Sequence, residues 1–366
     1  MNLNEKDIKF LEKLGISVID EKRNYWFVRT QAGAYYDDFI NENFIGIEWD
    51  KISDENLIRE GDEEKIKEEV SRHYDVDKPG YIASQICKFS NSMKKGDIVL
   101  IPNEKSKWMA FGEIVEDNMY LLEEAEDFEH VLDQFYNEVD SKDEKPILKK
   151  RRKVKWIKTV KRYDLDPYLQ SIIYSHNAIV DANIYSLFID RTLSQFYIKG
   201  DEAYYTYKVN KKKNIPYVDM LSFLNNNNEI ISYINSYYPD LSINADDLIL
   251  KISVQSKGPV QFKGKMRNVL IIGLIMGGLF GVKLGFKIPG FEYNLETEGL
   301  PKLLNSIQEF LEKKDSDDTS QEQKDELEKI IQQLQEDKKK LELQLPLEED
   351  MKNNQDQYEY CISEIK

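Results

Sequence analysis

The sequence predicts an α+β protein: a curved, barrel-like sheet with helices comes first, a small α+β segment follows, and a helix of the coiled-coil type comes last. Three observations support this order. Short β-type runs recur in the first half of the chain, a glycine-rich apolar window occupies 268–282, and leucines recur at heptad spacing within 320–345. A chain of 366 residues has room for two or three domains.

Residues 1–196 are predicted to form one domain built on about five strands. Each candidate strand is a short run rich in β-branched and aromatic residues, and 44–49 (FIGIEW) is apolar on both faces, which indicates a buried strand. The five runs are 25–30, 44–49, 98–102, 108–115 and 149–162. The acidic stretch 116–146 carries apolar residues at helical spacing and is predicted to be an inserted helix.

The second half of the chain alternates helical and strand-like segments. A β-hairpin and a helical extension are expected first, and the asparagine run 225–228 should interrupt that helix. Strand-like runs then flank a turn predicted at 257–259. The predicted parts are the hairpin and extension at 197–246, the α+β segment at 247–314, the coiled-coil helix at 320–345 and a loose tail at 346–366.

The apolar window 268–282 has three interpretations. It can be a buried helix or strand pair, which the flanking strand-like runs favour. It can be part of a membrane segment over 266–286, which tolerates Arg267 and Lys283 and approaches the length that a bilayer requires. It can also be an exposed self-association segment, since Gly273 and Gly277 form a GxxxG pair.

The last helix carries an apolar stripe. Leu327, Ile331, Leu334, Leu341 and Leu345 fit the a and d positions of one heptad register, with Lys338 at an a position. Such a stripe is typical of a short coiled coil or of a packed helix. The coiled-coil interpretation predicts a homo-oligomer formed through this helix.

Composition narrows the class of protein. The net charge of -16 excludes a general polyanion-coating role, so any nucleic-acid binding must come from a local patch. Cys87 and Cys361 form no disulfide framework and have no metal-ligand spacing, and the first residues are polar. We therefore expect a cytoplasmic protein, or one associated with the inner membrane if 266–286 enters the bilayer.

Motifs for catalysis are sparse. The three histidines are isolated, no Walker A loop is present, and the glycines of GLIMGGLFG do not follow GxGxxG. No catalytic residue, metal ligand or cofactor is therefore predicted. One nuclease-like trace exists, in which Asp246 and Asp247 precede Gln255, Ser256 and Lys257. An acidic residue and a lysine can hold Mg²⁺ beside a phosphate, but here both are predicted to lie on one strand with no turn between them.

The basic run 149–162 and the tryptophans suggest binding of an aromatic anion. The run carries dense positive charge around Trp156, and the other tryptophans, Trp26, Trp49 and Trp108, also lie on or beside predicted strands. Aromatic rings can stack on a base while Arg or Lys contacts the phosphate. The alternatives are core packing for each tryptophan and a solvated strand for the basic run.

Several stretches together resemble the PUA-like, EVE-related domain found at the N-terminus of restriction-system proteins of the Mrr and McrB type. The resemblance covers about residues 22–196 and rests on YWFVRT, FIGIEWDKI, KPGYIASQICKFSNSMKKGDIVLIP, WMAFGEI, RRKVKWIKTVKRYDL and NIYSLFIDRTLSQF. It implies a PUA-like barrel that holds a modified base or a nucleotide in an aromatic-lined pocket. The residues it implicates, together with the cations of the basic run, are Trp26, Arg29, Tyr36, Trp49, Lys155, Trp156 and Arg162.

The resemblance implies a non-enzymatic sensor of modified DNA or of a nucleotide in a prokaryotic anti-phage or restriction-type system. The C-terminal part would transmit binding by self-association, and a partner encoded in the same operon is expected. One alternative is a degenerate Mrr-like, Mg-dependent nuclease that uses Asp247 and Lys257. Another is a membrane-associated effector that inserts 266–286.

Overall fold

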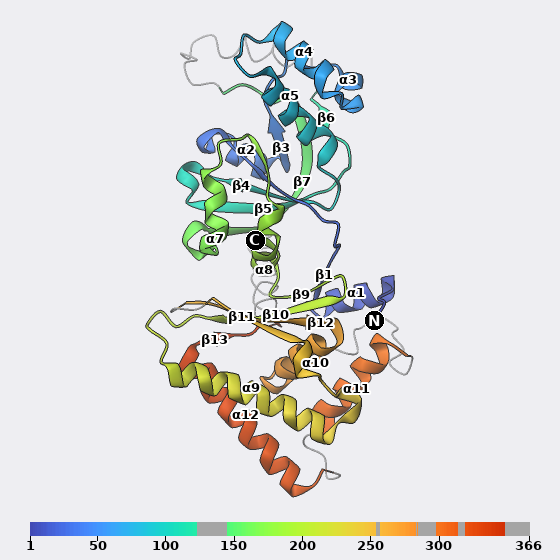
Figure 1. Ribbon diagram of the computed structural model, residues 1–366, viewed down its shortest axis with the longest axis vertical. Coiled ribbons are helices and arrows are strands. Elements are labelled where there is room, and N and C mark those ends of the chain that lie inside the picture. Colours follow the sequence, from blue (N-terminus) through green and yellow to red (C-terminus); the bar gives the residue numbers. More distant parts are fainter. Residues whose placement is uncertain (123–144, 254–256, 283, 285–297, 314–318, 348–366) are drawn as a thin grey trace, which may run out of the picture. The chain divides into compact units, whose positions relative to one another are not determined.

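The computed structural model describes residues 1–122, 145–253, 257–282, 284, 298–313 and 319–347. The chain is an α+β protein that divides into two compact units (Figure 1). The central unit is Lys22–Leu193, and the composite unit joins Met1–Glu21 to Ser194–Lys366. This division differs from the domain predicted at 1–196, because β1 (Ser17–Ile19) pairs in parallel with β9 (Phe196–Lys199). The first 21 residues therefore belong to the sheet of the composite unit.

The strands of the central unit form one sheet that curls into a half-barrel (Figure 1). They are β2 (Tyr25–Val28), β3 (Phe44–Ile47), β4 (Ile98–Pro102), β5 (Trp108–Ile114), β6 (Tyr120–Leu121), β7 (Lys150–Lys161) and β8 (Ile179–Asp181). Their order is β3-β7-β5-β4-β2-β8, and β6 also pairs with β7. The β2–β4 pair is parallel and the other pairs are antiparallel. The five predicted strands correspond to β2, β3, β4, β5 and β7.

Both faces of this sheet are apolar and covered by helices. Side chains alternate along a strand, so Val99 and Ile101 of β4 join one core while Ile98 and Leu100 join another. Helices α2 (Tyr36–Asn41), α3 (Glu55–Glu60), α4 (Glu63–His73) and α5 (Pro79–Cys87) contribute to the first core. Helices α7 (Pro167–Gln170) and α8 (Ser186–Leu193) contribute to the second.

The basic run forms β7, but two of its cations are buried, against the expectation that they face solvent. Lys150 and Arg152 have no solvent exposure, whereas Lys153 and Lys155 are exposed. Arg152 donates hydrogen bonds to the carbonyl oxygens of Ser90 (2.7 Å) and Asp117 (3.0 Å), among others. Burial lowers its pKa to about 10. The guanidinium thus satisfies carbonyls at the end of the π-helical turn Lys88–Ser92, as cations often do at a helix C-terminus.

The composite unit has a second sheet of six strands with helices on one face (Figure 1). The strand order is β1-β9-β10-β12-β11, and β13 also pairs with β10. The further elements are α1 (Glu5–Lys13), β10 (Glu202–Val209), α9 (Tyr217–Tyr237), β11 (Leu248–Ile252), β12 (Gly258–Lys265), α10 (Met266–Leu279), α11 (Leu300–Lys313), α12 (Gln321–Leu341) and β13 (Leu343–Gln344). The segments predicted separately at 197–246 and 247–314 share this sheet, because β10 pairs with β12 along its whole length.

The apolar window forms the buried helix α10, the first of its three interpretations. Every residue of α10 is buried except Arg267 and Gly278. The backbone at Gly273 lies so close to the sheet that a Cβ atom there would come within 2.5 Å of Phe196 Cζ. The glycine thus allows the helix to approach β9 and β10 rather than a second helix. None of the helices in the described ranges has the length and apolarity needed to cross a bilayer.

The leucine stripe of α12 is packed inside its own chain. Leu327, Leu334 and Leu341 are buried in the core of the composite unit, where α12 lies against α9. Helix α9 is continuous through the asparagine run, in contrast to the predicted break. Asn226 donates a hydrogen bond of 2.6 Å to Asp337 Oδ2 of α12, so the run supplies a buried polar contact between the two helices.

Several predicted segments lie wholly or partly outside the described residues. They include the helix of the acidic stretch 116–146, the strand-like run after 282, the linker at 315–320 and most of the tail 346–366.

Candidate functional site

Residues from four elements of the central unit come together around residues 48–50. We call Tyr35, Glu48, Trp49, Asp50, Tyr74 and Lys150 the Trp49 cluster. Tyr35 immediately precedes α2, Glu48–Asp50 follow β3, Tyr74 ends α4, and Lys150 begins β7. Trp49, Glu48, Asp50 and Tyr74 are half-buried, and Trp49 packs against the first core of this unit.

The backbone of Trp49 is strained. Its φ of 69° lies in the left-handed region, and no other aromatic residue in the described part of the chain has a positive φ. A bulky side chain in this region costs about 1–2 kcal/mol. The Trp49 carbonyl oxygen accepts hydrogen bonds from Lys150 Nζ (2.8 Å) and from the Ile52 amide (3.0 Å), which hold the conformation. Strain that the surroundings enforce in this way is common at binding sites.

The cluster concentrates titratable groups with perturbed pKa values. Burial, and then the charge of Asp50, raise the pKa of Glu48 above its usual range. Burial and these two carboxylates also raise the pKa of Tyr35 and of Tyr74. Burial lowers the pKa of Lys150 to about 8, although Asp50 Oδ1 lies 3.6 Å from its Nζ and favours the charged form. Several perturbed groups around one strained residue are typical of a functional site.

The hydroxyls and cations around the cluster already have partners, which leaves Glu48 as its adaptable polar group. The Tyr35 hydroxyl donates to the Pro146 carbonyl oxygen (2.8 Å), and the Tyr74 hydroxyl accepts from the Lys51 amide (3.0 Å). A half-buried carboxyl with a raised pKa can accept a hydrogen bond when ionised or donate one when protonated. Such a carboxyl next to a tryptophan in the chain suits a flat ring that carries amino or ring-nitrogen groups, whereas the nearby carboxylates disfavour a phosphate.

A second set of predicted residues meets at the other end of β7. Arg162 Nη2 donates to the Tyr174 hydroxyl (2.8 Å), and Arg29 Nη1 donates to the Ser175 carbonyl oxygen. Neither arginine has a carboxylate partner among the described residues. Beside them, Lys161 Nζ lies 5.2 Å from the centre of the Trp108 ring. Positive charge with exposed aromatic rings suits the backbone of a nucleic acid.

The remaining predicted residues are held by the fold. Trp26 Nε1 donates to Asp97 Oδ2 (2.9 Å) within the core. Trp156 Nε1 donates to the Phe39 carbonyl oxygen (2.8 Å), and its ring lies over Gly112, so Trp156 joins α2 to β7 and β5. The Tyr36 hydroxyl bonds to the Thr159 side chain at the same junction. Lys155 lies exposed on β7 opposite Glu113 of β5.

The structure therefore separates the predicted residues instead of gathering them around one pocket. Ile47 pairs with Lys150, whereas Trp156 lies six residues further along β7. Arg162 follows the last residue of β7 and Lys150 is the first, so Arg162 and Lys150 of the Trp49 cluster lie at opposite ends of this strand. Among the predicted residues, Arg29 and Arg162 meet at Ser175 and Tyr174, and Tyr36 and Trp156 meet where α2 packs on β7.

The nuclease-like residues do not assemble. Asp247 immediately precedes β11 and forms an ion pair of 2.9 Å with Lys265 at the far end of β12. Lys257 lies at the opposite end of this hairpin, immediately before β12, and Gly258 and Pro259 belong to β12 instead of the predicted turn. The length of β11 thus separates Asp247 from Lys257 by about 17 Å. Gln255 and Ser256 lie outside the described residues.

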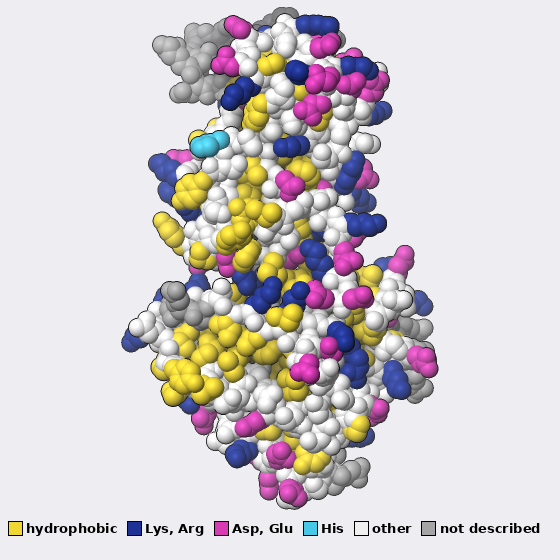
Figure 2. Space-filling model, in the orientation of Figure 1, with side chains coloured by type: hydrophobic (Ala, Val, Ile, Leu, Met, Phe, Trp, Pro, Cys, Tyr) yellow, Lys and Arg dark blue, Asp and Glu magenta, His cyan; other side chains and the backbone are white. Residues whose placement is uncertain are grey.

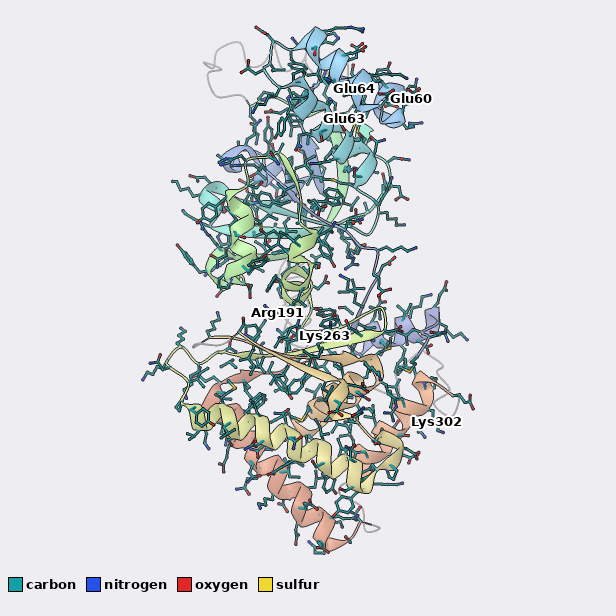
Figure 3. All side chains as sticks on the ribbon, in the orientation of Figure 1. Glu60, Glu63, Glu64, Arg191, Lys263 and Lys302 are labelled. Atoms are coloured by element: carbon teal, nitrogen blue, oxygen red, sulfur yellow. The ribbon has the colours of Figure 1, made fainter. Side chains whose placement is uncertain are left out.

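Acidic residues and a thiol on α3, α4 and α5 provide no further site. Glu60, Glu63 and Glu64 lie along α3 and α4 (Figure 3), where Glu60 pairs with Lys65 and Glu64 with Lys67. No group of three potential metal ligands occurs among the described residues. Burial, and then Glu63, raise the pKa of the Cys87 thiol to about 11, so it is not an activated nucleophile.

Sequence reasoning found Trp49 but missed its partners. A signal for Glu48 and Asp50 was present, since they flank a tryptophan directly after a wholly apolar strand. Tyr35 and Tyr74 carry no such signal, because they reach the cluster from distant helices.

Comparison with known proteins adds one match. Residues 26–181, which include the Trp49 cluster and both arginines, match the family described as Domain of unknown function (DUF8426). No curated protein and no solved structure matched the chain.

Proposed function

We propose that the central unit is a non-enzymatic, PUA-like binding domain that recognises a base of modified DNA at the Trp49 cluster. The observation that carries this proposal is the strained, half-buried Trp49 beside Glu48, whose pKa burial raises. The indole would stack on the base, and stacking on an aromatic side chain contributes about 1–3 kcal/mol per base. The Glu48 carboxyl would read the edge of the base by hydrogen bonding.

The two ends of β7 would contact different parts of the ligand, the base at the Trp49 cluster and the phosphates at the other end. Arg29 and Arg162 would contact phosphates, which position a nucleic acid without reading its sequence. Arg162 follows one end of the 12-residue strand β7 and Lys150 of the Trp49 cluster begins the other end, so a ligand that touches both Arg162 and Trp49 is a chain of nucleotides rather than a single one. This favours DNA over a free nucleotide. The resemblance to EVE-related domains of restriction systems supports a role in prokaryotic defence.

The test measures binding of the full chain to labelled oligonucleotides with modified and unmodified bases, and to the corresponding mononucleotides. We expect Trp49→Ala to abolish the preference for the modified base and to weaken its binding about tenfold or more, since stacking is lost. Trp108→Ala is the matched control, because it removes an exposed tryptophan at the other end of β7.

The outcomes separate clearly. Trp108→Ala should affect modified and unmodified oligonucleotides equally, and Arg162→Gln should weaken both and reduce the salt dependence of binding. The proposal is wrong if no oligonucleotide binds, or if Trp49→Ala and Trp108→Ala have the same effect on base preference. Binding of mononucleotides as tight as that of oligonucleotides would assign the site to a free nucleotide.

A further inference from the structure

Strand β11 forms an edge of the sheet in the composite unit. It pairs with β12 on one side, and on its other side no strand in the described ranges pairs with it. The Ser253 amide donates to the Pro259 carbonyl oxygen (3.1 Å), so the odd-numbered residues of this strand direct their backbone groups toward β12. In an antiparallel ladder the intervening residues point the opposite way. Leu248, Leu250 and Ile252 therefore direct their N–H and C=O groups outward.

The side chains of this edge are apolar and exposed. The exposed fractions are 51% for Ile249, 38% for Leu250 and 46% for Ile252. Figure 2 shows apolar side chains gathered over β11 and the start of α9, where Tyr217, Val218 and Leu221 are also exposed. Natural sheets usually protect an edge with charges, proline or a bulge, because an open edge pairs with other strands. In β11 the one charged residue is Lys251.

We propose that β11 pairs antiparallel with β11 of a second copy of this chain, about a twofold axis at Leu250. This inference is independent of the proposed function. Pairing would join the two sheets into one continuous sheet and satisfy the outward backbone groups of Leu248, Leu250 and Ile252. It would also cover the exposed side chains of Leu250 and Ile252.

The sequence of β11 is self-complementary in this register. Leu250 faces its own copy, Leu248 faces Ile252, and Ile249 faces Lys251, so the two lysines do not meet. A register centred on Lys251 would place the lysines opposite each other, which is unfavourable. A register centred on Ile249 would pair fewer strand residues. Five paired residues form a small interface, so the dimer should be in equilibrium with monomer.

The register makes opposite predictions for two variants at Ile249. Side chains at 249 and 251 would form pairs without backbone hydrogen bonds, in which side chains approach most closely. Ile249→Glu would place a carboxylate opposite Lys251 twice per dimer, whereas Ile249→Lys would place like charges there. Both variants remove the same exposed apolar group, so each is the matched control of the other.

The experiment is sedimentation equilibrium of the full chain and of both variants over a range of concentrations. We expect a concentration-dependent dimer that Ile249→Glu retains and that Ile249→Lys weakens, with at least about a tenfold difference between the dissociation constants of the variants. Circular dichroism should show the same fold for all three proteins, since Ile249 is exposed. A dimer that responds equally to both variants would overturn the pairing and its register. A monomer at every concentration would overturn self-association and leave the edge to a strand of another protein.

Discussion

The strain at Trp49 can be measured by comparing two truncations of the same side chain. Trp49→Ala and Trp49→Gly both remove the half-buried indole, but alanine keeps the cost of a positive φ and glycine does not. Loss of a fully buried tryptophan costs about 3–5 kcal/mol, so a half-buried one should cost roughly 2 kcal/mol. Glycine should recover about 1 kcal/mol of this, because relief of the strain exceeds its entropic disadvantage.

At an ordinary strand position the glycine variant is less stable than the alanine variant, which is the reverse of the order expected at Trp49. Trp108 begins β5 and has no positive φ, so Trp108→Gly should be less stable than Trp108→Ala by about 0.5–1 kcal/mol. These substitutions serve as the matched control.

Urea unfolding followed by tryptophan fluorescence measures this difference in the full chain. All four tryptophans lie in the central unit, so the three that remain in each variant report on that unit alone. Trp49→Gly should unfold at a higher urea concentration than Trp49→Ala. If Trp49→Gly is equally or less stable, the backbone of Trp49 is not strained. If the order at Trp108 is also reversed, the comparison does not isolate strain.

Two further predictions concern a carboxyl and a pair of glycines. Because its folded-state pKa is raised, Glu48 contributes stability that is full below its unfolded pKa and is lost as the pH rises through the folded pKa. Glu48→Gln should therefore be more stable than the natural chain at about pH 7 and similar to it at about pH 4, as measured by urea unfolding. Equal stability of the two proteins at about pH 7 would contradict this prediction. Gly273→Ala should lower the stability of the composite unit by about 1–3 kcal/mol in denaturation followed by circular dichroism, because its Cβ would overlap Phe196. Gly277→Ala, whose Cβ would come 3.3 Å from Leu347 Cδ1, should be neutral or slightly stabilising, and equal effects would refute the packing argument.

The strands were predictable because they follow from local patterns. Alternation or a short apolar run is enough to identify β2, β3, β4, β5 and β7 within one or two residues. The pairing of β1 with β9 depends on residues about 180 positions apart, and nothing in the local sequence encodes it. The division of the chain into units was therefore not predictable, although most of its strands were.

The environment of a side chain was predictable only where a charged residue is exposed and an apolar residue is buried. The cations of 149–162 suggested a solvated strand, yet Lys150 and Arg152 are buried because carbonyl oxygens of other elements accept their hydrogen bonds. Burial of this kind depends on where those carbonyls lie, which the sequence does not reveal. The same limit applies to the site, since Trp49 was identified from its neighbours in sequence but Tyr35 and Tyr74 reach it through the fold.

Two features could indicate self-association, the leucine stripe of α12 and the open edge of β11, and they differ in whether the same chain can satisfy them. An apolar helical stripe can be covered by another helix of the same chain, and α12 uses its leucines in this way against α9. Its heptad pattern therefore cannot distinguish a packed helix from an intermolecular coiled coil. The outward N–H and C=O groups of an edge strand have no partner within that strand, so another segment or water must satisfy them. For this chain, exposed Ile249, Leu250 and Ile252 on the edge strand β11 are the stronger indication of where two copies would meet under the proposed pairing.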